Sequence, residues 1–317
     1  MKGKILFLCT AHYDLYKIFE DGFKKYTDYE VQTVLYKRYK YKSHGERVTN
    51  FLSKVFLNKN LKRIKGSEQY LEGLDDHYDY LFMICPEMVL PQHLTQLTKK
   101  ADKTVVYYWD GFDHFPQAIP TIKYFQRAFT FDRVDAKKYD INFITNFYFH
   151  EKRNTNYEYD LFFLASYDSR YPLIAKIAKS LQQQNKKAVI KLHANKIPKI
   201  KEKIPQGIEF IKEFISFEDT KEYMSKARII LDIHKNVHTG LSFRIFEAMG
   251  LGKKLITTNP DVVNYDFYNA NNIFVWTEDT EALPTEFLSG PYEELPDEIY
   301  KKYSQENWVK TILGIAT

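Results

Sequence analysis

The chain has 317 residues, 44% of them apolar and 16% aromatic, with a formal net charge of +5 at pH 7. This length and composition exclude a disordered chain and predict a globular protein of two domains. Its two cysteines, Cys9 and Cys85, end apolar runs, so we expect buried thiols instead of a disulfide framework or a metal site. Neither a secretory signal nor an apolar run long enough to cross a bilayer is evident, so we expect a cytoplasmic protein.

Residues 1–150 alternate apolar runs with amphipathic segments, which is typical of a parallel sheet with helical crossovers. We therefore expect a first Rossmann-like domain over these residues. The polar segment 150–156 lacks apolar periodicity and is the expected linker. The expected strands are Ile5–Cys9, Val31–Tyr36, Tyr80–Cys85, Thr104–Trp109, Ala128–Phe131 and Phe143–Phe149.

A basic segment within this domain, Lys37–Lys65, contains ten lysines and arginines and one acidic residue, Glu46. Aromatic and aliphatic side chains, Phe51 and Phe56 among them, lie between the charges. This mixture is typical of a surface that meets anionic lipid headgroups, so we expect peripheral association with the inner face of the plasma membrane. A solvated basic helix and loop is the alternative. We expect no nucleic-acid partner, because no recognised binding module accompanies the segment.

The first domain also carries a polar cluster, Trp109–His114, directly after an expected strand. Its carboxylates suit sugar hydroxyls and its aromatic rings suit sugar C–H groups, so Asp110, Asp113 and His114 are candidates for binding an acceptor sugar. His12 follows the first strand and should reach the same sheet edge. A turn capped by aspartate is the alternative.

Residues 157–296 repeat the alternating pattern and predict a second Rossmann-like domain. The segment 297–317 has a helical pattern, and we expect it to pack back on the first domain. Two tandem domains predict a central cleft, because ligands of such sheets bind at the carboxyl ends of strands. The expected strands are Asp160–Ala165, Ala188–Leu192, Glu209–Ile211, Ile229–Ile233, 253–257 and Ile273–Trp276, and the expected helices are Tyr171–Gln183, Thr220–Ser225 and 243–250.

A phosphate-binding loop is expected where the strand ending at Ala165 turns into the next helix. Small residues such as Ser166 let the backbone approach a phosphate, and Arg170 can neutralise it. An ordinary helix N-cap by Ser166 or Asp168 is the alternative. His193 and His234, which also end apolar strands, are interpreted as structural groups.

The segment 239–258, TGLSFRIFEAMGLGKKLITT, predicts a turn, a short helix and an apolar strand. Arg244 and Glu247 are three residues apart and share a helix face, so we expect their side chains to point to one place. Arginine suits a diphosphate, and glutamate suits paired ribose hydroxyls. A surface ion pair of little energetic value is the alternative. The expected donor-binding residues are Ser166, Arg170, Thr239, Gly240, Arg244, Glu247 and Lys253.

This segment resembles the donor-site signature of GT-B glycosyltransferases of the retaining family-4 type. There a Glu, seven residues, a second Glu and Ala-Met precede a Gly and an apolar strand. Glu247 stands at the second Glu, which in that family usually holds the ribose. Thr239 replaces the first Glu, which contacts the donor sugar. Residues 228–275, and the segment Phe131–Tyr139, look like bacterial proteins of capsule, O-antigen or lipopolysaccharide biosynthesis.

The resemblance implies a GT-B hexosyltransferase that moves a sugar from a nucleotide-diphosphate donor to a lipid-linked surface glycan. We expect a UDP-sugar as donor, no cofactor and no metal. If the anomeric centre is inverted, Asp110, Asp113 or His114 is a candidate for the base. A retaining reaction requires no positioned base beyond the departing diphosphate. Two alternatives stay open, a nucleotide-sugar epimerase or hydrolase of the same fold and a noncatalytic nucleotide-sugar-binding protein.

Overall fold

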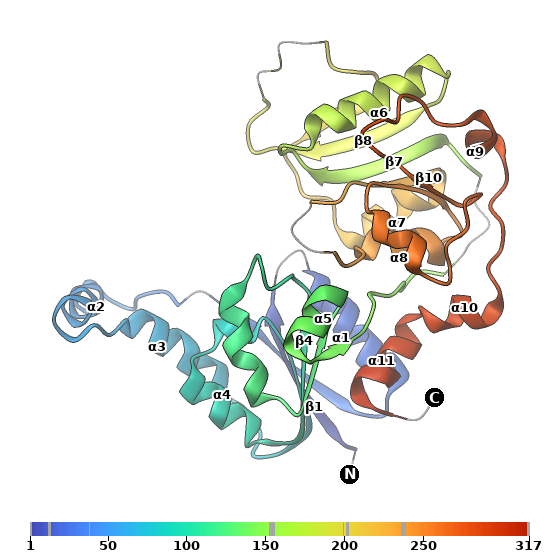
Figure 1. The fold of residues 1–317 in the computed structure, drawn as a ribbon. Coiled ribbons are helices and arrows are strands. Elements are labelled where there is room, and N and C mark those ends of the chain that lie inside the picture. Colours follow the sequence, from blue (N-terminus) through green and yellow to red (C-terminus); the bar gives the residue numbers. More distant parts are fainter. Residues whose placement is uncertain are drawn as a thin grey trace. The chain divides into compact units, whose positions relative to one another are not determined.

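The computed structural model describes residues 2–11, 14–37, 39–151, 156–198, 200, 203–235 and 239–315, with the backbone alone at 217 and 218. Contacts within the chain divide it into two compact units. Unit 1 comprises Met1–Ile144 with Val309–Thr317, and unit 2 comprises Thr145–Trp308. Each unit is built around a six-stranded sheet (Figure 1).

The sheet of unit 1 is parallel, with strand order β2-β1-β3-β4-β5-β6. Helices connect most of its strands, as the alternating sequence pattern predicts. The elements are β1 (Lys4–Thr10), α1 (Leu15–Tyr26), β2 (Glu30–Tyr36), α2 (His44–Leu57), α3 (Leu61–Glu68), η2 (Gln69–Leu71), β3 (Tyr78–Ile84), η3 (Pro86–Met88), α4 (Pro91–Thr98), β4 (Ala101–Tyr108), η4 (Pro116–Tyr124), β5 (Arg127–Thr130), α5 (Arg133–Tyr139) and β6 (Asn142–Phe143).

Alternate side chains of the central strands of unit 1 fill two separate cores. Phe7 of β1 packs against Phe19 and Phe23 of α1 on one face. Leu6 of β1 belongs to a cluster with Leu94 of α4 on the other face. A parallel sheet buried on both faces requires apolar residues at successive positions, which explains the continuous apolar runs in the sequence.

Polar contacts hold α2 against α3. Asn50, which is 3% exposed, accepts a hydrogen bond from the backbone N–H of Lys62 at 2.9 Å and donates one to the Tyr41 hydroxyl at 2.8 Å. Glu46 accepts hydrogen bonds from Lys65 Nζ and from the Lys42 backbone N–H, both at 2.6 Å. The hydrogen bond from Lys65 contributes most to lowering the pKa of Glu46 to about 2.

The lowered pKa of Glu46 predicts a pH-dependent contribution to stability. The group has an ordinary value of 4.5 when unfolded and about 2 when folded, so its contribution is present above pH 4.5 and is lost as pH falls toward 2. We expect Glu46→Gln to unfold at lower urea than wild type at pH 6. The gap in urea midpoint should narrow steadily between pH 5 and pH 3, and a constant gap would contradict the assignment.

The sheet of unit 2 is also parallel, with strand order β12-β11-β10-β7-β8-β9. Strands β7, β10 and β11 are therefore direct neighbours. The elements are β7 (Tyr159–Ser166), α6 (Tyr171–Gln183), β8 (Ala188–His193), β9 (Ile208–Ile211), α7 (Phe217–Lys226), β10 (Ala227–Asp232), α8 (Phe243–Gly250), β11 (Lys254–Thr257), η5 (Pro260–Asn264), β12 (Ile273–Val275), α9 (Thr285–Ser289) and α10 (Asp297–Lys302). The last helix, α11 (Gln305–Leu313), begins in unit 2 and ends in unit 1.

The two faces of this second sheet bury different helices. Leu231 of β10 lies in a cluster with Ile177 of α6, and Ile230 lies in a separate cluster with Ile245 and Phe246 of α8. Helix α8 thus runs back along the sheet from the carboxyl end of β10 to the amino end of β11. This course decides which residues of segment 239–258 can meet.

The units divide the chain at other points than the expected domain boundaries. Residues 145–150 and 297–308 make their contacts within unit 2, because Tyr148 exchanges backbone hydrogen bonds with Tyr303 and Gln305 at 3.0 and 2.9 Å. The last residues contact unit 1. Arg127 donates to the carbonyl of Ile312 at 3.0 Å, and the Tyr80 hydroxyl donates to that of Leu313 at 3.1 Å.

Within the described ranges, no helix combines the length and the apolar character that a membrane crossing requires. Cys9 is a buried free thiol and Cys85 a half-buried one. Burial raises the pKa of Cys9 to about 12 and that of Cys85 well above its ordinary value. Both thiols are therefore poor nucleophiles at neutral pH.

Candidate functional site

The candidate site lies in unit 2, where the neighbouring strands β7, β10 and β11 end. Ser166 ends β7 and Arg170 lies in the loop that follows it, and the loop after β10 carries Thr239 and Gly240. Carboxyl ends of parallel strands meet at one edge of a sheet, and β7 and β10 are adjacent, so these residues lie at the same edge. Ser166 and Thr239 are exposed at this edge, whereas Gly240 is buried.

Asp232, the last residue of β10, organises this edge. It is 2% exposed, and its Oδ1 accepts hydrogen bonds from Ser242 Oγ at 2.8 Å and from Arg244 Nη1 at 3.1 Å. Its Oδ2 accepts one from Thr257 Oγ1 at 3.0 Å. One buried carboxylate therefore ties the start of α8 and the end of β11 to β10. The sequence signal for Asp232 was a charged residue closing an apolar strand, but our candidate residues did not include it.

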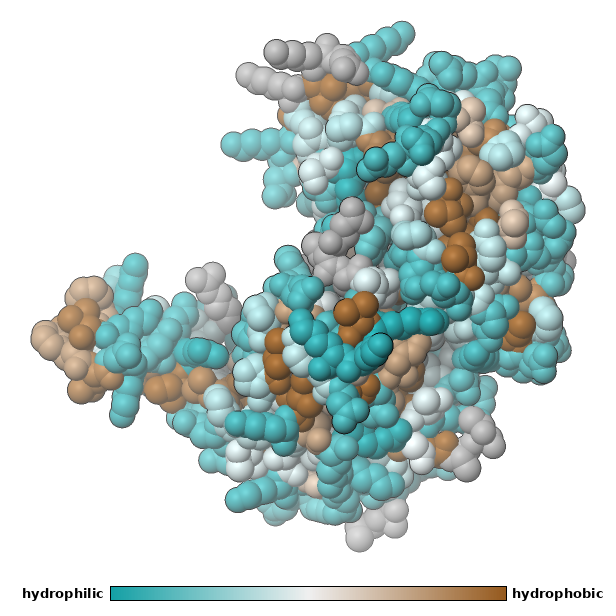
Figure 2. All heavy atoms as spheres, in the orientation of Figure 1, coloured by the Kyte–Doolittle hydropathy of each residue, from teal (hydrophilic) through white to brown (hydrophobic). Residues whose placement is uncertain are grey.

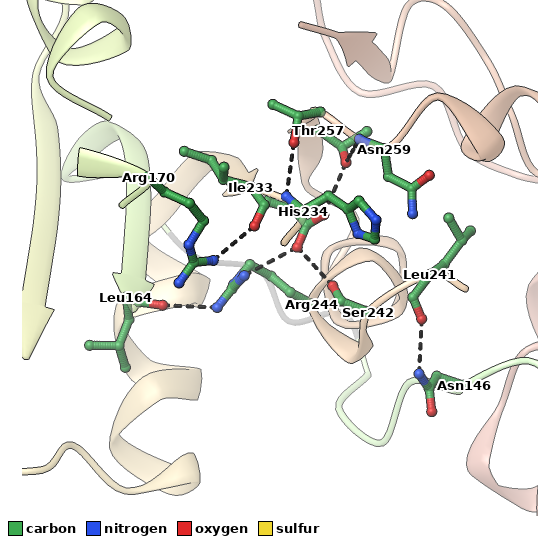
Figure 3. Close-up of polar contacts among 12 residues, drawn as sticks. Asn146, Leu164, Arg170, Ile233, His234, Leu241, Ser242, Arg244, Thr257 and Asn259 are labelled. Carbon is green, nitrogen blue, oxygen red and sulfur yellow. Dashed lines mark hydrogen bonds and ion pairs between the residues drawn. The ribbon is translucent and has the colours of Figure 1, made fainter. Parts of the chain in front are cut away.

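Two guanidinium groups converge beside Asp232. Arg244 donates through Nη2 to the carbonyl of Leu164 at 2.8 Å, and Arg170 donates through Nη1 to the carbonyl of Ile233 at 2.9 Å (Figure 3). Burial lowers the pKa of Arg244, the positive charge of Arg170 adds to this, and Asp232 opposes it. Together with Lys235 the two arginines outnumber the carboxylates that pair with them, Asp168 and Asp232, and this excess of positive charge favours an anion at the edge.

Asp168 holds Arg170 in place. Its two oxygens accept from Arg170 Nε and Nη2 at 2.9 and 2.8 Å, and these side-chain hydrogen bonds lower the pKa of Asp168. The planar, two-point contact leaves Arg170 little rotational freedom. The Lys235 Nζ atom lies 3.9 Å from the same carboxylate and adds positive charge.

The loop before α8 is fixed by an amide. Asn259 Nδ2 donates to the carbonyls of Thr239 and Gly240 at 3.2 and 3.3 Å, and its backbone N–H donates to Thr257 Oγ1 at 3.1 Å. From the other side, Asn146 Nδ2 donates to the carbonyl of Leu241 at 2.9 Å (Figure 3). The loop is thereby positioned before any ligand arrives.

Glu247 does not share a target with Arg244, and our prediction that both point to one place is wrong. Glu247 is 5% exposed and accepts from the Phe149 backbone N–H at 2.8 Å and from His150 Nδ1 at 2.5 Å. Burial raises the pKa of Glu247, and the hydrogen bond from His150 opposes this. The two residues share a helix face, but the long Arg244 side chain reaches toward the start of α8 while Glu247 reaches the segment 149–150.

Lys253 lies at the opposite edge of the sheet. It is 4% exposed, its Nζ donates to the Ser225 carbonyl at 2.5 Å, and the same nitrogen lies 4.5 Å from the centre of the Tyr157 ring. The reason is the course of α8, which returns the chain to the amino end of β11 before Lys253. The structure therefore does not place Lys253 with the other predicted donor-binding residues.

The remaining candidates lie in the loop after β4 of unit 1. Asp110 is half-buried, and Asp113 and His114 are exposed, with Asp113 3.8 Å from Lys138 Nζ. The loop is anchored by Phe112, whose backbone N–H donates to Asp135 Oδ2 at 2.8 Å. His12 lies outside the described residues.

Glu87, in the loop after the neighbouring strand β3, is a candidate that our sequence interpretation missed. Burial raises its pKa, and the negative charge of Asp110 raises it further. A carboxylic acid with a raised pKa at the end of a parallel strand is a candidate for a role in proton transfer. The sequence signal was the Cys-Pro-Glu that follows the apolar run. Among the residues that the structure describes, no three His, Cys, Asp or Glu side chains form a group suited to a metal ion.

Solved structures with the same architecture include a kitacinnamycin glycotransferase, with 11% identity, full coverage of both chains and a TM-score of 0.52. A UDP-forming α,α-trehalose-phosphate synthase from Burkholderia xenovorans has 8% identity and a TM-score of 0.58, covering 98% of this chain and 99% of its own. The N-terminal domain of a Candida albicans trehalose-6-phosphate phosphatase has 11% identity and a TM-score of 0.56, covering 100% and 98%.

The chain has the two-lobed GT-B fold. No family model and no curated protein matches its sequence. The arginine pair Arg170 and Arg244 lies in the second lobe of this fold, at the carboxyl edge of the sheet.

Proposed function

We propose that the protein is a glycosyltransferase that binds a nucleotide-diphosphate sugar at the carboxyl edge of unit 2. The observation that carries this proposal is the convergence of Arg170 and Arg244 beside the strand ends. Contacts with carboxylates and backbone carbonyls hold both guanidinium groups in place beside a loop that is itself fixed, which is preorganised positive charge of the kind that stabilises a diphosphate. The GT-B fold and the resemblance of segment 239–258 to a donor motif support the same conclusion.

In this reaction the bond between the anomeric carbon and the diphosphate oxygen breaks, and a new bond forms to an acceptor hydroxyl. The diphosphate leaves with the bonding electrons and becomes more negative, while the hydroxyl proton passes to a base or to the leaving group. Positive charge placed beforehand at the diphosphate lowers the barrier, because it stabilises charge that develops in the transition state. This is the role we assign to Arg170 and Arg244.

For Glu247 we retain ribose binding as a proposal in a restricted form. Its two oxygens accept from Phe149 and His150, so a ribose hydroxyl would have to share or replace one of these donors. A carboxylate oxygen has two lone pairs, which permits sharing without loss of the internal contact. We therefore expect Glu247→Gln to reduce the free energy of donor binding by more than it reduces the free energy of unfolding.

We assign the acceptor to unit 1. Asp110 and Glu87 are the groups best suited to take a proton there, because they follow neighbouring strands and the pKa of Glu87 is raised. The resemblance to capsule, O-antigen and lipopolysaccharide proteins supports a lipid-linked surface glycan as acceptor. It also supports a hexose as the transferred sugar.

Calorimetry with a panel of UDP-, GDP-, CMP- and dTDP-sugars tests the proposal. We expect micromolar to millimolar binding of a UDP-sugar, unchanged in EDTA, because the arginine pair supplies the charge that a metal would otherwise supply. Heat from none of the donors would reject the function, and binding that EDTA abolishes would reject metal independence. Isomerised or free sugar formed rapidly without acceptor would instead indicate an epimerase or a hydrolase.

A further inference from the structure

Helix α2 of unit 1 has its amphipathic character reversed. An ordinary surface helix buries its apolar stripe, but α2 buries Asn50 and Ser53, which are 3% and 6% exposed. Its apolar side chains are 46% to 76% exposed. They are Val48, Phe51, Leu52, Val55, Phe56 and Leu57.

These apolar residues, all but Leu57, lie on one side of α2. Val48, Phe51, Leu52 and Val55 follow the i, i+3, i+4, i+7 spacing of a single helix face, and Phe56 extends it. Figure 2 shows apolar side chains gathered over α2, next to hydrophilic ones. We call this the α2 apolar face. Monomeric soluble proteins rarely expose such contiguous patches without a binding partner.

Specific contacts fix the outward orientation of the α2 apolar face. Asn50, on the opposite side of the helix, is bonded to Tyr41 and to the backbone of Lys62. Glu46, on the same side as Asn50, is bonded to Lys65. Rotating α2 to bury its apolar residues would break these bonds and leave buried polar groups without partners, which is costly. The contacts of α2 within unit 1 therefore keep the α2 apolar face exposed.

Exposed cations lie beside the α2 apolar face. Arg47 and Lys54 lie about two helical turns apart on its flank, and Lys59 and Arg63 follow in the next loop and in α3. Glu46, the one acidic residue between Lys37 and Lys65, is already paired with Lys65. A second copy of this chain docked on the face would bring like charges together, which opposes self-association. Anionic headgroups instead complement the cations, and acyl chains accept the apolar side chains.

We propose that α2 docks the protein on an anionic lipid surface. Val48, Phe51 and Val55 enter the boundary between headgroups and acyl chains, and Arg47 and Lys54 contact lipid phosphates. Because the cations and the apolar residues lie on one helix, both contribute to the same binding event. This docking does not depend on the proposed sugar transfer.

Vesicle co-sedimentation tests the proposal with the full chain. We expect binding to phosphatidylcholine vesicles that contain phosphatidylglycerol, weaker binding to phosphatidylcholine alone, and release by salt. Val55→Glu should lower the partition coefficient by about tenfold or more, and Lys54→Glu by about fivefold or more. Val263→Glu is the matched control, because Val263 of unit 2 is also an exposed valine, 47% exposed, and this change should leave the partition coefficient unaltered.

Three results would overturn lipid docking. They are no sedimentation of the wild type with anionic vesicles, equal binding by Val55→Glu, and a wild-type dimer in light scattering that Val55→Glu dissociates. The last result would assign the α2 apolar face to a second copy. Circular dichroism shows whether each variant is folded, and donor calorimetry on Val55→Glu separates this question from the proposed function, because donor heat should persist.

Discussion

Replacing Arg244 with alanine is expected to weaken donor binding by about tenfold or more and to slow sugar transfer by about 100-fold or more. The larger effect on rate arises because the leaving diphosphate gains negative charge in the transition state, where the loss of a cation costs most. Calorimetry with the donor found in the panel measures the first quantity. Initial rates of nucleoside diphosphate release measure the second.

Arg228 provides a matched control for Arg244. It lies near the amino end of β10, donates to the Ser289 carbonyl at 3.2 Å, and is far along the strand from Asp232. Arg228→Ala should leave donor binding unchanged. Arg244→Lys keeps the positive charge but cannot donate to two acceptors in a fixed geometry, so its donor affinity should lie between those of wild type and Arg244→Ala. Equal donor affinity in Arg244→Ala and wild type would remove Arg244 from the site.

The sequence predicted most of the fold because local periodicity encodes it. The helix expected at Tyr171–Gln183 is α6 with the same bounds, since its apolar spacing and the proline in its first turn are local signals. The apolar runs also identified the parallel strands. The strand expected at Phe143–Phe149 is wrong beyond β6, which ends at Phe143. There Tyr148 forms only an isolated β-bridge with Ser304, while Phe147 packs against Trp308 and Tyr148 against Tyr300, so side-chain burial accounts for most of the apolar run.

The positions of site residues were predictable where they follow from the meeting of the carboxyl ends of parallel strands at one sheet edge, which we call the sheet-edge rule. They were not predictable where a side chain is held by residues distant in the sequence. Ser166 ends β7, Arg170 and Thr239 follow the neighbouring strands β7 and β10, and the rule places all three at one sheet edge. The partners of Glu247 lie almost 100 residues earlier in the chain, at Phe149 and His150, and no local pattern indicates them. The spacing of the apolar residues of α2 is visible in the sequence. Their exposure is not, because it follows from the burial of Asn50, which depends on Tyr41 and on α3.

Replacing Gly250 with alanine is expected to destabilise the protein by about 3 kcal/mol. Gly250 ends α8, and a Cβ atom there would lie 2.5 Å from the His150 carbonyl oxygen and 2.6 Å from Tyr148 Cβ. Both atoms belong to a segment held by backbone hydrogen bonds, so neither can move without cost. Urea unfolding of wild type and Gly250→Ala measures the difference.

Gly45 near the start of α2 is the matched control. A Cβ atom there would come no closer than 3.7 Å to Ser43 Oγ, which is ordinary contact, so Gly45→Ala should stabilise by about 0.5 kcal/mol through helix propensity. If Gly250→Ala is as stable as Gly45→Ala, the segment 148–150 does not run beside α8. The expected loss of stability would give a structural reason for the sequence Glu-Ala-Met-Gly, because Glu247 and Gly250 would both be needed to hold the segment 148–150 beside α8. Arg244, three residues before Glu247, points away from that segment and can take part in donor binding.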